Sequence, residues 1–257
     1  MLVSIITPTT GNSLLKQTLE SIQNQDYKHI EHLIIIDGQE READTYHILN
    51  QSEFKKKTYV VTWPYVTGKD RFNGHKIYGA TSYLANGDYL VFLDEDNWFD
   101  ENHISSLVEL VNQNKLDWAY SLRKIMDREG NFITNDDCES LGKWPSFLNE
   151  QDHLVDVNCY FVKKEIGIVI SPLWHRKNKE PGSLDVDRAM CANLIKLFPK
   201  FDTTGLYSVN YRVGSTAISV KPEFFLRGNL KMKDKYPEQF PWRKSNYSLD
   251  NQTHIII

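Results

Sequence analysis

The chain has 257 residues, of which 40% are hydrophobic and 25% are charged, and its formal net charge is −4. This length lies near the upper limit of what one hydrophobic core supports, so we expect a single α/β domain over residues 1–257. Because a surface that binds nucleic acid is basic, the mild negative charge argues against a nucleic-acid partner.

Cysteine usage and the lack of long apolar runs indicate where the protein works. The three cysteines are far apart and include no Cys-x-x-Cys, which favours reduced thiols over a disulfide framework: Cys138, Cys159 and Cys191. Residues 1–12 lack the basic start of a signal peptide, and no apolar run reaches the ~20 residues of a membrane span. We therefore expect a cytoplasmic protein with at most peripheral contact with the inner face of the membrane.

Short apolar runs alternate with stretches of helical spacing over residues 1–115. The runs that suit buried strands cover residues 3–7, 32–36, 59–62 and 89–93. Between them, apolar residues recur every three or four positions after Asn12, from Ile77 to Leu84 and after Asp100. We expect Asn12 and Asp100 to cap their helices. Near-continuous apolar strands separated by helices predict a Rossmann-like, mostly parallel twisted sheet with helices on both faces.

Polar residues gather where these strands end, which is where ligands bind in such sheets. Residues 7–11 follow the first strand, Asp37 follows the second, and residues 94–96 follow the fourth. The sequence contains no Gly-x-Gly-x-x-Gly after the first strand and no P-loop pattern. A dinucleotide cofactor and a P-loop phosphate site are therefore not expected.

Three consecutive acids, Asp94, Glu95 and Asp96, follow the apolar fourth strand. Neighbouring carboxylates repel one another, so they need a compensating positive charge unless all three reach water. Alternate residues of an extended chain point the same way, so Asp94 and Asp96 can face one ligand together. Because Mg²⁺ and Mn²⁺ are commonly held by one or two carboxylates and substrate phosphates, the run predicts a divalent-cation site.

Four segments of the first half, in their order and spacing, resemble family-2 glycosyltransferases of the GT-A fold. The segments are VSIITPTTGN, LLKQTLESIQNQ, HLIIIDG and NGDYLVFLDEDN. The resemblance covers residues 1–115 and implies a nucleotide-sugar-binding half, with an acceptor-binding and catalytic-base half over residues 116–257. It implies that Asp94 and Asp96 form an Asp-x-Asp motif that coordinates Mn²⁺ or Mg²⁺ on the donor diphosphate, with Asp96 as the main ligand.

The resemblance also implies which residues contact the donor. Thr7, Pro8 and Thr9 lie where the first loop packs on the nucleoside, and Glu95 lies inside the Asp-x-Asp motif. Asp37 would accept a hydrogen bond from the base. Because uracil and thymine carry an N3–H donor, UDP or dTDP sugars are favoured. The family's usual second acid is missing after Asp37, so the base or ribose contacts can differ.

Three cations stand where the family carries an arginine-rich helix start: Lys69, Arg71 and Lys76. They can face the donor diphosphate and stabilise the leaving group, or they can form a solvated basic turn that pairs with surface acids. His175, beside Trp174, is a candidate third metal ligand or acceptor contact.

The second half has to supply the acceptor site and the catalytic base. Residues 117–125 and 155–162 suit strands, and Asp185 and Asp187 stand at the start of a predicted helix. Many inverting family members carry the base in an acidic pair at such a position, and the resemblance ranks Asp187 first and Asp185 second. Acids are also favourable at a helix N-terminus through the helix dipole alone, and Asp185 can simply be a cap.

These observations predict a metal-dependent inverting glycosyltransferase. One displacement would move the sugar from a nucleoside diphosphate to a hydroxyl of a glycan, lipid-linked or other acceptor. Two other classes stay open. A nucleotidyltransferase usually needs a glycine-rich basic loop after the first strand, where this chain has one glycine and one distant lysine. A non-catalytic nucleotide-sugar- or carbohydrate-binding module would keep Asp37 and the Asp-x-Asp motif without turnover.

Overall fold

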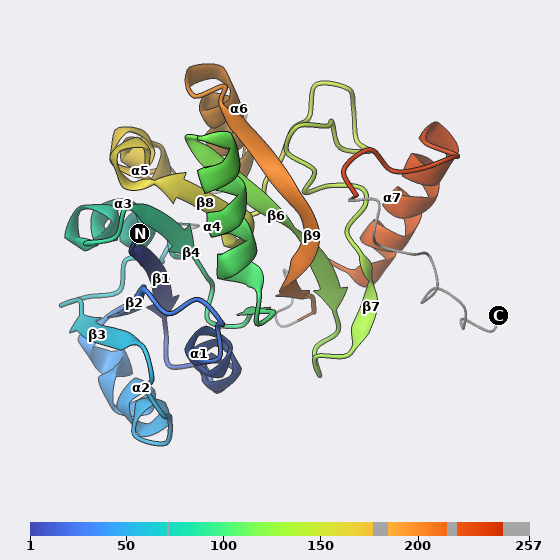
Figure 1. Ribbon diagram of the computed structural model, residues 1–257. Helices are drawn as coiled ribbons and strands as arrows, with labels where there is room; N and C mark the ends of the chain where they lie inside the picture. The colour runs from blue at the N-terminus through green and yellow to red at the C-terminus, as the bar shows by residue number, and fades with distance from the viewer. Residues whose placement is uncertain (71, 177–184, 215–219, 244–257) are drawn as a thin grey trace.

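The computed structural model describes residues 1–70, 72–176, 185–214 and 220–243. Within these residues, nine strands form one sheet in the order β3-β2-β1-β4-β8-β6-β9-β5, and β7 pairs with β6. Helices lie on both faces of this sheet (Figure 1). Arg71, one of the cations expected at the diphosphate, lies outside the described residues.

The four strands of the first half are parallel, as the sequence predicts. Strand β1 lies between β2 and β4, and β2 pairs in turn with β3. Every residue of β1, β2 and β4 is buried, as expected for strands that are covered on both faces. The bounds are Val3–Thr9 (β1), Ile30–Ile36 (β2), Lys57–Thr62 (β3) and Tyr89–Phe92 (β4).

The strands of the second half extend the same sheet with mixed directions. Strand β8 runs antiparallel to both β4 and β6, whereas β6 and β9 are parallel. Strand β5 is antiparallel to β9, and β7 is antiparallel to β6. The bounds are Trp98–Phe99 (β5), Trp118–Met126 (β6), Phe132–Asn135 (β7), Tyr160–Lys163 (β8) and Phe201–Arg212 (β9).

The strand expected over residues 155–162 is shorter than predicted, because β8 starts only at Tyr160. A 3₁₀ turn, Val157–Cys159, precedes it, and the side chain of Asp156 caps this turn by accepting from the Asn158 backbone N–H at 3.0 Å. The local bond between an aspartate and the backbone two residues on competes with strand pairing. It also turns Asn158 out of the strand register that the apolar pattern predicted.

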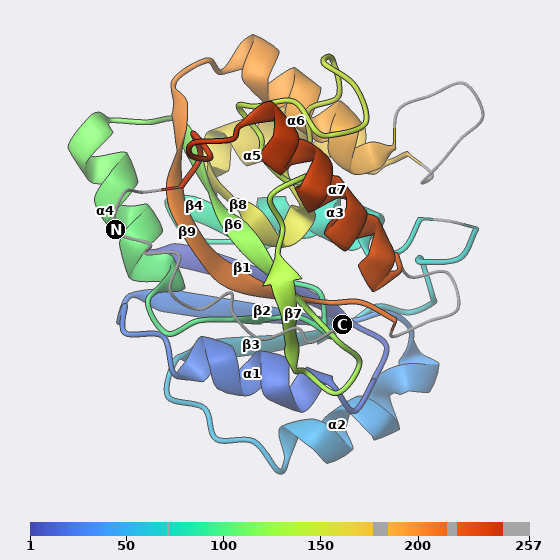
Figure 2. The ribbon, with the colours of Figure 1, turned by 90° about the vertical axis from the view of Figure 1, so that its right-hand side faces the viewer.

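The helices form two layers. Helices α1 and α2 lie on one face of the sheet, and α3, α5 and α6 lie on the other (Figures 1 and 2). Helix α4 packs against β6 and β9, and α7 packs beside β7. The bounds are Leu15–Gln23 (α1), Glu42–Leu49 (α2), His75–Leu84 (α3), His103–Asn114 (α4), Lys164–Ile170 (α5), Val186–Leu197 (α6) and Pro222–Lys235 (α7). No helix in the described ranges is both long enough and apolar enough to cross a bilayer.

The two predicted helix caps differ from expectation. The Asn12 side chain accepts from the backbone N–H of Leu14 at 3.0 Å, which is one residue before α1, so it orders the approach to the helix. The Asp100 side chain does not cap α4. It binds Lys124 Nζ at 2.7 Å and Asn210 Nδ2 at 2.9 Å, because a charged partner from β6 lies within reach.

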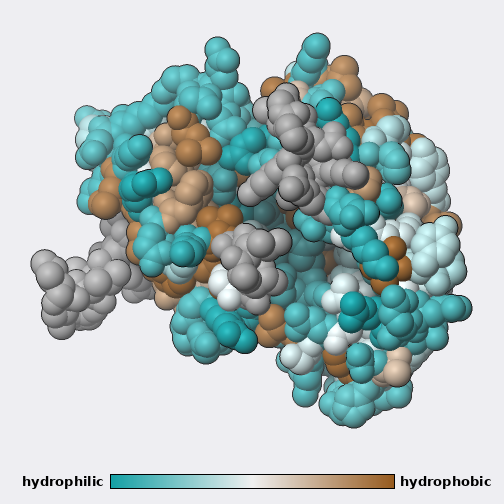
Figure 3. All heavy atoms as spheres, turned by 180° about the vertical axis from the view of Figure 1, so that it is seen from behind, coloured by the Kyte–Doolittle hydropathy of each residue, from teal (hydrophilic) through white to brown (hydrophobic). Residues whose placement is uncertain are grey.

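The carboxyl ends of β1, β2 and β4 meet at one edge of the sheet. The backbone N–H of Asp37 donates to the carbonyl of Thr9 at 2.9 Å, and that of Leu93 donates to Ile6 at 3.0 Å. The first loop, Asp37 and the acidic run therefore lie side by side, as the topology predicts. Seen from behind, the molecule is hollowed near its middle, and hydrophilic residues predominate around the hollow (Figure 3).

Candidate active site

Asp94 is held rigidly at the end of β4. The Tyr78 hydroxyl, from α3, donates to one carboxylate oxygen, and Asn158 Nδ2 donates to the other at 3.1 Å. The Asp94 backbone N–H in turn donates to Asn158 Oδ1 at 2.7 Å. Three contacts from two other elements therefore fix the direction of this carboxylate.

The acids around Asp94 repel one another strongly. Burial, and next the charge of Asp96, raise the pKa of Asp94 to about 7. Burial, followed by the charges of Asp156 and Asp94, raises the pKa of Asp187 to about 8. One buried oxygen of Asp187, Oδ1, has no hydrogen-bond partner among the described residues. The first turn of α6 thus brings Asp187 into the same acidic cluster as the end of β4.

Asp185 has different surroundings from Asp187. It occupies the N-cap position of α6, but its side chain makes no capping hydrogen bond and lies 3.7 Å from Arg188 Nη1. Arg188 also binds Asp152 at 2.6 Å and Glu139 at 3.0 Å, so it ties the start of α6 to the segment before β8. The structure therefore places Asp187, and not Asp185, against the acidic cluster.

A buried arginine, Arg123 on β6, organises the other side of the cluster. Its guanidinium binds Asp136 and Glu139 at 2.8 Å each, and it also pairs with Asp156. Arg123 is only 2% exposed, so these three acids supply the charge that its burial requires. This pairing holds Asp156 next to Asp187, and the guanidinium neutralises part of the negative charge of Asp156.

Glu95 points to the first loop rather than to open space. Its carboxylate accepts from the Thr9 hydroxyl at 2.6 Å, from the Thr10 hydroxyl at 2.6 Å and from the Asn12 backbone N–H at 3.1 Å. Thr7 is fully buried, and its hydroxyl lies 2.9 Å from His32 Nε2. Of the predicted donor contacts, Glu95, Thr7 and Thr9 thus bind other parts of the chain in this structure.

Asp37 fixes the loop that follows β3. One oxygen accepts from the Thr67 backbone N–H at 2.7 Å and from its hydroxyl at 2.8 Å, and the other accepts from the Gly68 N–H at 3.0 Å. A carboxylate has about four acceptor positions, and partners among the described residues use three of those of Asp37. Pro8, from the first loop, packs against Gly74 at the start of α3.

Three basic side chains, Lys69, Lys76 and Arg212, differ in their surroundings. Lys69 is exposed, and Lys76 Nζ lies 3.7 Å from the centre of the Phe72 ring. Arg212, at the end of β9, donates from Nε to the carbonyl oxygen of Asp96 at 3.1 Å. The sequence did not single out Arg212, because its position beside the acidic run depends on the pairing of β5 with β9.

The donor groups at the end of β4 fit a hard divalent cation. Asp94 and Asp96 supply carboxylate oxygens, and their repulsion is the feature that a cation would relieve. Among the described side chains, no group of three or more His, Cys, Asp or Glu is arranged to hold a metal ion. His175 therefore does not complete a three-ligand site with Asp94 and Asp96. Its ring lies beside Phe72, with the ring centres 5.7 Å apart.

Tyr78 and Asn158, the two side chains that hold Asp94, were also missed by the sequence reasoning. Tyr78 falls within a stretch of helical spacing and was not singled out, and Asn158 falls inside a predicted strand. A signal existed for Asn158, since Asp156 and Asn158 are polar residues at alternate positions of an otherwise apolar run. No comparable signal marks Tyr78, because helical spacing does not show that its hydroxyl reaches Asp94.

The chain resembles known proteins in sequence. The profile of the family described as "Glycosyl transferase family 2" matches residues 4–163. A GalNAc(5)-diNAcBac-PP-undecaprenol beta-1,3-glucosyltransferase of Campylobacter jejuni is 28% identical over 157 residues, which is 60% of this chain and 47% of that protein. The chain therefore spans about half the length of this relative.

The chain also resembles solved structures. S. aureus TarS 1–349 in complex with UDP-GlcNAc matches 91% of this chain and 67% of its own length, at 14% identity and a TM-score of 0.63. The same protein in complex with UDP covers 93% and 66%, at 13% identity and a TM-score of 0.59. At such low identity the likeness shows the fold alone, and it confirms the expected GT-A fold.

The Arg123 cluster predicts a large loss of stability on truncation. Arg123→Ala leaves two acids, Asp136 and Asp156, without an ion-pair partner, so we expect the free energy of unfolding to fall by about 3–5 kcal/mol. The matched control is Lys124→Ala on the same strand, which breaks a partly exposed pair with Asp100 and should cost about 0–1 kcal/mol. Urea denaturation of both variants measures the difference. Equal losses would contradict a central role for Arg123.

Proposed function

Because the chain belongs to glycosyl transferase family 2, we propose that it transfers a sugar from a nucleoside diphosphate sugar to a hydroxyl group, with inversion at the anomeric carbon. A glycan or lipid-linked acceptor is favoured, because the C. jejuni relative is named for a lipid-linked glycan. The observation that carries the proposal is Asp187, a carboxylate with one buried, unpartnered oxygen next to the acidic cluster.

Asp94 and Asp96 are the residues that would hold Mg²⁺ or Mn²⁺. When bound, the cation would supply positive charge to the departing nucleoside diphosphate. Tyr78 and Asn158 hold the two oxygens of the Asp94 carboxylate, and the Arg212 guanidinium binds the backbone carbonyl of Asp96. These neighbours limit the freedom of the carboxylates before any ligand arrives, which is how a site becomes preorganised.

The donor nucleoside would lie over the loops at the ends of β1 and β2. Donors among the described residues use three of the four acceptor positions of Asp37, and the fourth would suit the N3–H of uracil or thymine. The same carboxylate orders Thr67 and Gly68, so it would position the loop as well as bind the base. Thr9 and Glu95 would act through the shape of the first loop, and Lys69 and Lys76 are candidates for the diphosphate.

Asp187 is the general base in this proposal. A base with a pKa near the working pH combines a useful ionised fraction with a strong pull on the proton. Burial and neighbouring acids raise the pKa of Asp187 to about 8, which is in that range. Asp187 would take the proton of the acceptor hydroxyl as the hydroxyl attacks the anomeric carbon. A single in-line displacement then inverts the configuration.

The metal assignment is tested by Asp96→Ala. We expect this variant to lose Mn²⁺-dependent donor affinity, because the substitution removes the main carboxylate ligand. Asp234→Ala, at an exposed acid on α7, is the matched control and should bind as the unchanged chain does. Calorimetric titration with UDP, with and without Mn²⁺, gives the affinities. Unchanged Mn²⁺ dependence in Asp96→Ala would rule the assignment out.

The base specificity is tested with four nucleotides. UDP and dTDP should bind more tightly than CDP or GDP, because a carboxylate can accept from N3–H of uracil and thymine but not from N3 of cytosine. Titrations in the presence of Mn²⁺ rank the affinities, and Asp37→Asn should lessen the preference. Tight binding of GDP together with no binding of UDP or dTDP would overturn this part of the proposal.

The base is tested by Asp187→Asn, which keeps the shape of the side chain but cannot take a proton. Sugar transfer should fall by ~10²–10⁴-fold, whereas donor affinity should stay nearly the same. The matched control is Asp185→Asn, two residues earlier, where the transfer rate should change little. A dead Asp185→Asn enzyme and an active Asp187→Asn enzyme would reverse the assignment, and two active variants would remove the base from this helix.

Asp187→Asn should lower the transfer rate but raise the stability of the folded chain at high pH. The pKa of Asp187 is raised on folding, so the unfolded chain loses its proton near pH 4 while the folded chain keeps it to about pH 8. The wild-type chain therefore loses stability as pH rises through this window. Asp187→Asn should melt at a higher temperature than wild type at pH 8, and the gap should close towards pH 4.

A further inference from the structure

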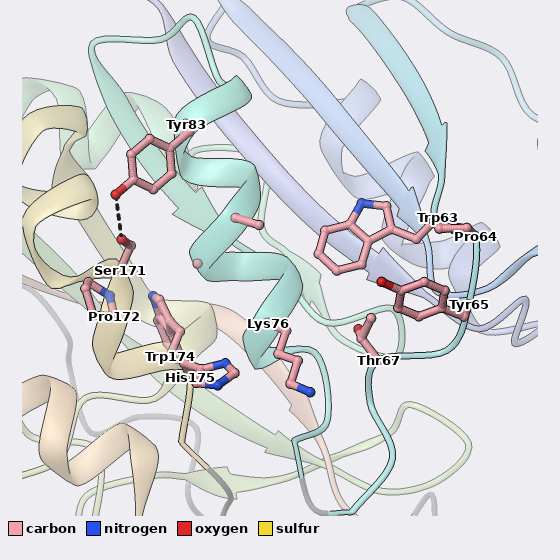
Figure 4. A pocket seen from close by; sticks show the side chains of 12 residues that line it. Trp63, Pro64, Tyr65, Thr67, Lys76, Tyr83, Ser171, Pro172, Trp174 and His175 are labelled. Carbon is pink, nitrogen blue, oxygen red and sulfur yellow. Dashed lines mark hydrogen bonds between the residues drawn. The ribbon is translucent and has the colours of Figure 1, made fainter.

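A trench crosses the outward face of α3 (Figure 4). Its volume is about 590 Å³. The loop after β3 forms one wall, and the 3₁₀ turn Ser171–Trp174 forms the other. We call this feature the α3 trench. The proposed transfer reaction uses only two of its lining residues, Lys76 at the diphosphate and Thr67 in the loop that Asp37 orders, and none of its aromatic side chains.

Small residues on α3 make the trench possible. Ala80 is exposed on the floor, and Gly79 lets the turn after α5 come close. A Cβ atom at Gly79 would lie 3.0 Å from the Ser171 carbonyl oxygen and 3.2 Å from the Trp174 Cβ. Lys76 and Tyr83 stand one turn before Ala80 and one turn after it on the same face, so the floor between them is about 10 Å long.

The walls of the trench combine exposed aromatic rings with polar atoms. Tyr65 is 69% exposed and Tyr83 is 59% exposed, and Trp63 lies beside Tyr65 in the same wall (Figure 4). The Tyr83 hydroxyl accepts from Ser171 Oγ at 3.3 Å. The indole N–H of Trp174 is buried and has no partner among the described residues. Two basic side chains, Lys76 and His175, lie at one end.

This combination fits a carbohydrate better than a lipid. A pyranose presents an apolar C–H face that packs on aromatic rings, and hydroxyls that bond to phenol, indole and ammonium groups. An isoprenoid chain would leave those polar groups without partners, and it would gain little from rings that stay open to water. The length of the floor suits a short oligosaccharide better than one sugar.

The trench lies beside the donor site and is connected to it through packed side chains. The Trp174 ring contacts the Tyr78 ring at 5.4 Å between centres, and the Tyr78 hydroxyl donates to Asp94. On the opposite wall, the Thr67 hydroxyl donates to Asp37. A ligand in the trench would therefore touch Thr67, which binds Asp37, and would lie one packed side chain away from Tyr78, which binds Asp94.

We propose that the α3 trench binds an oligosaccharide segment of the acceptor, at a site separate from the reacting hydroxyl. This inference rests on the proposed function, because it assumes an acceptor that contains several sugars. Tyr65 and Tyr83 supply the stacking surfaces, and His175 binds hydroxyl or acidic groups at one end.

The test is a glycan array that carries linear di- to tetrasaccharides of glucose, galactose and their N-acetylamino forms. The full chain should bind one or more of these glycans, and Tyr65→Ala and Tyr83→Ala should each weaken that binding about tenfold. Tyr65→Phe keeps the ring and should retain most of the affinity. The matched control is Tyr46→Ala on α2, at a tyrosine that is 42% exposed outside the trench, and it should bind normally.

Donor binding is measured on the same variants by calorimetry with UDP and Mn²⁺, and it should not change in Tyr65→Ala or Tyr83→Ala. Binding of no glycan on the array, or equal binding by Tyr46→Ala and the trench variants, would overturn the inference. Loss of UDP affinity in the trench variants would also overturn it, by making the trench part of the donor site. Farnesyl diphosphate serves as the lipid probe. If it binds the full chain and the Tyr65→Ala and Tyr83→Ala variants lose that binding, the trench is a lipid site and the inference is overturned.

These outcomes separate the two proposals. A chain that binds UDP with Mn²⁺ but no glycan refutes the trench inference and leaves the proposed transfer intact. A chain whose trench binds glycans while UDP fails to bind with or without Mn²⁺ refutes the proposed function and leaves a carbohydrate-binding site.

Discussion

Repulsion between carboxylates at a partly buried sheet edge is the constraint on which this structure depends. Asp94 and Asp187 have pKa values raised to about 7 and about 8, and in each case burial and neighbouring acids act in the same direction. Such a cluster persists only where other contacts hold it in place. Arg123 holds Asp156 from behind, and Tyr78 holds Asp94 from α3. A bound cation and a proton taken from the acceptor would neutralise the remaining negative charge.

Two arginines, Arg123 and Arg188, also explain how irregular backbone can carry a precise site. The segment between β7 and β8 has one short 3₁₀ turn as its regular structure in the described chain, yet it supplies the acids that bind Arg123 and Arg188. Glu139 binds both guanidinium groups, so helix α6 and strand β6 share one partner. Charge pairing therefore takes the place of strand pairing in positioning this half of the site.

The sequence predicts the first half well, because the periods of its strands and helices are strong and uninterrupted. The end of β4, the position of Asp37 and the helix that carries Asp187 are all where apolar spacing puts them. Side-chain directions are harder to predict. Residue spacing does not show that Glu95 turns to the first loop, or that a 3₁₀ turn aims Asn158 at Asp94. Those directions arise from contacts between segments that lie far apart in the chain.

Glu95 links two segments at the sheet edge that the sequence presents as separate motifs. Its carboxylate joins the end of β4 to the loop after β1 through bonds to Thr9, Thr10 and Asn12. The loop that would face a nucleoside and the acids that would face its phosphates are thus mechanically coupled. Neither can shift without the other, so the distance between them is fixed. In the proposed transfer, this spacing would set how the nucleoside and the phosphates of the donor lie relative to one another.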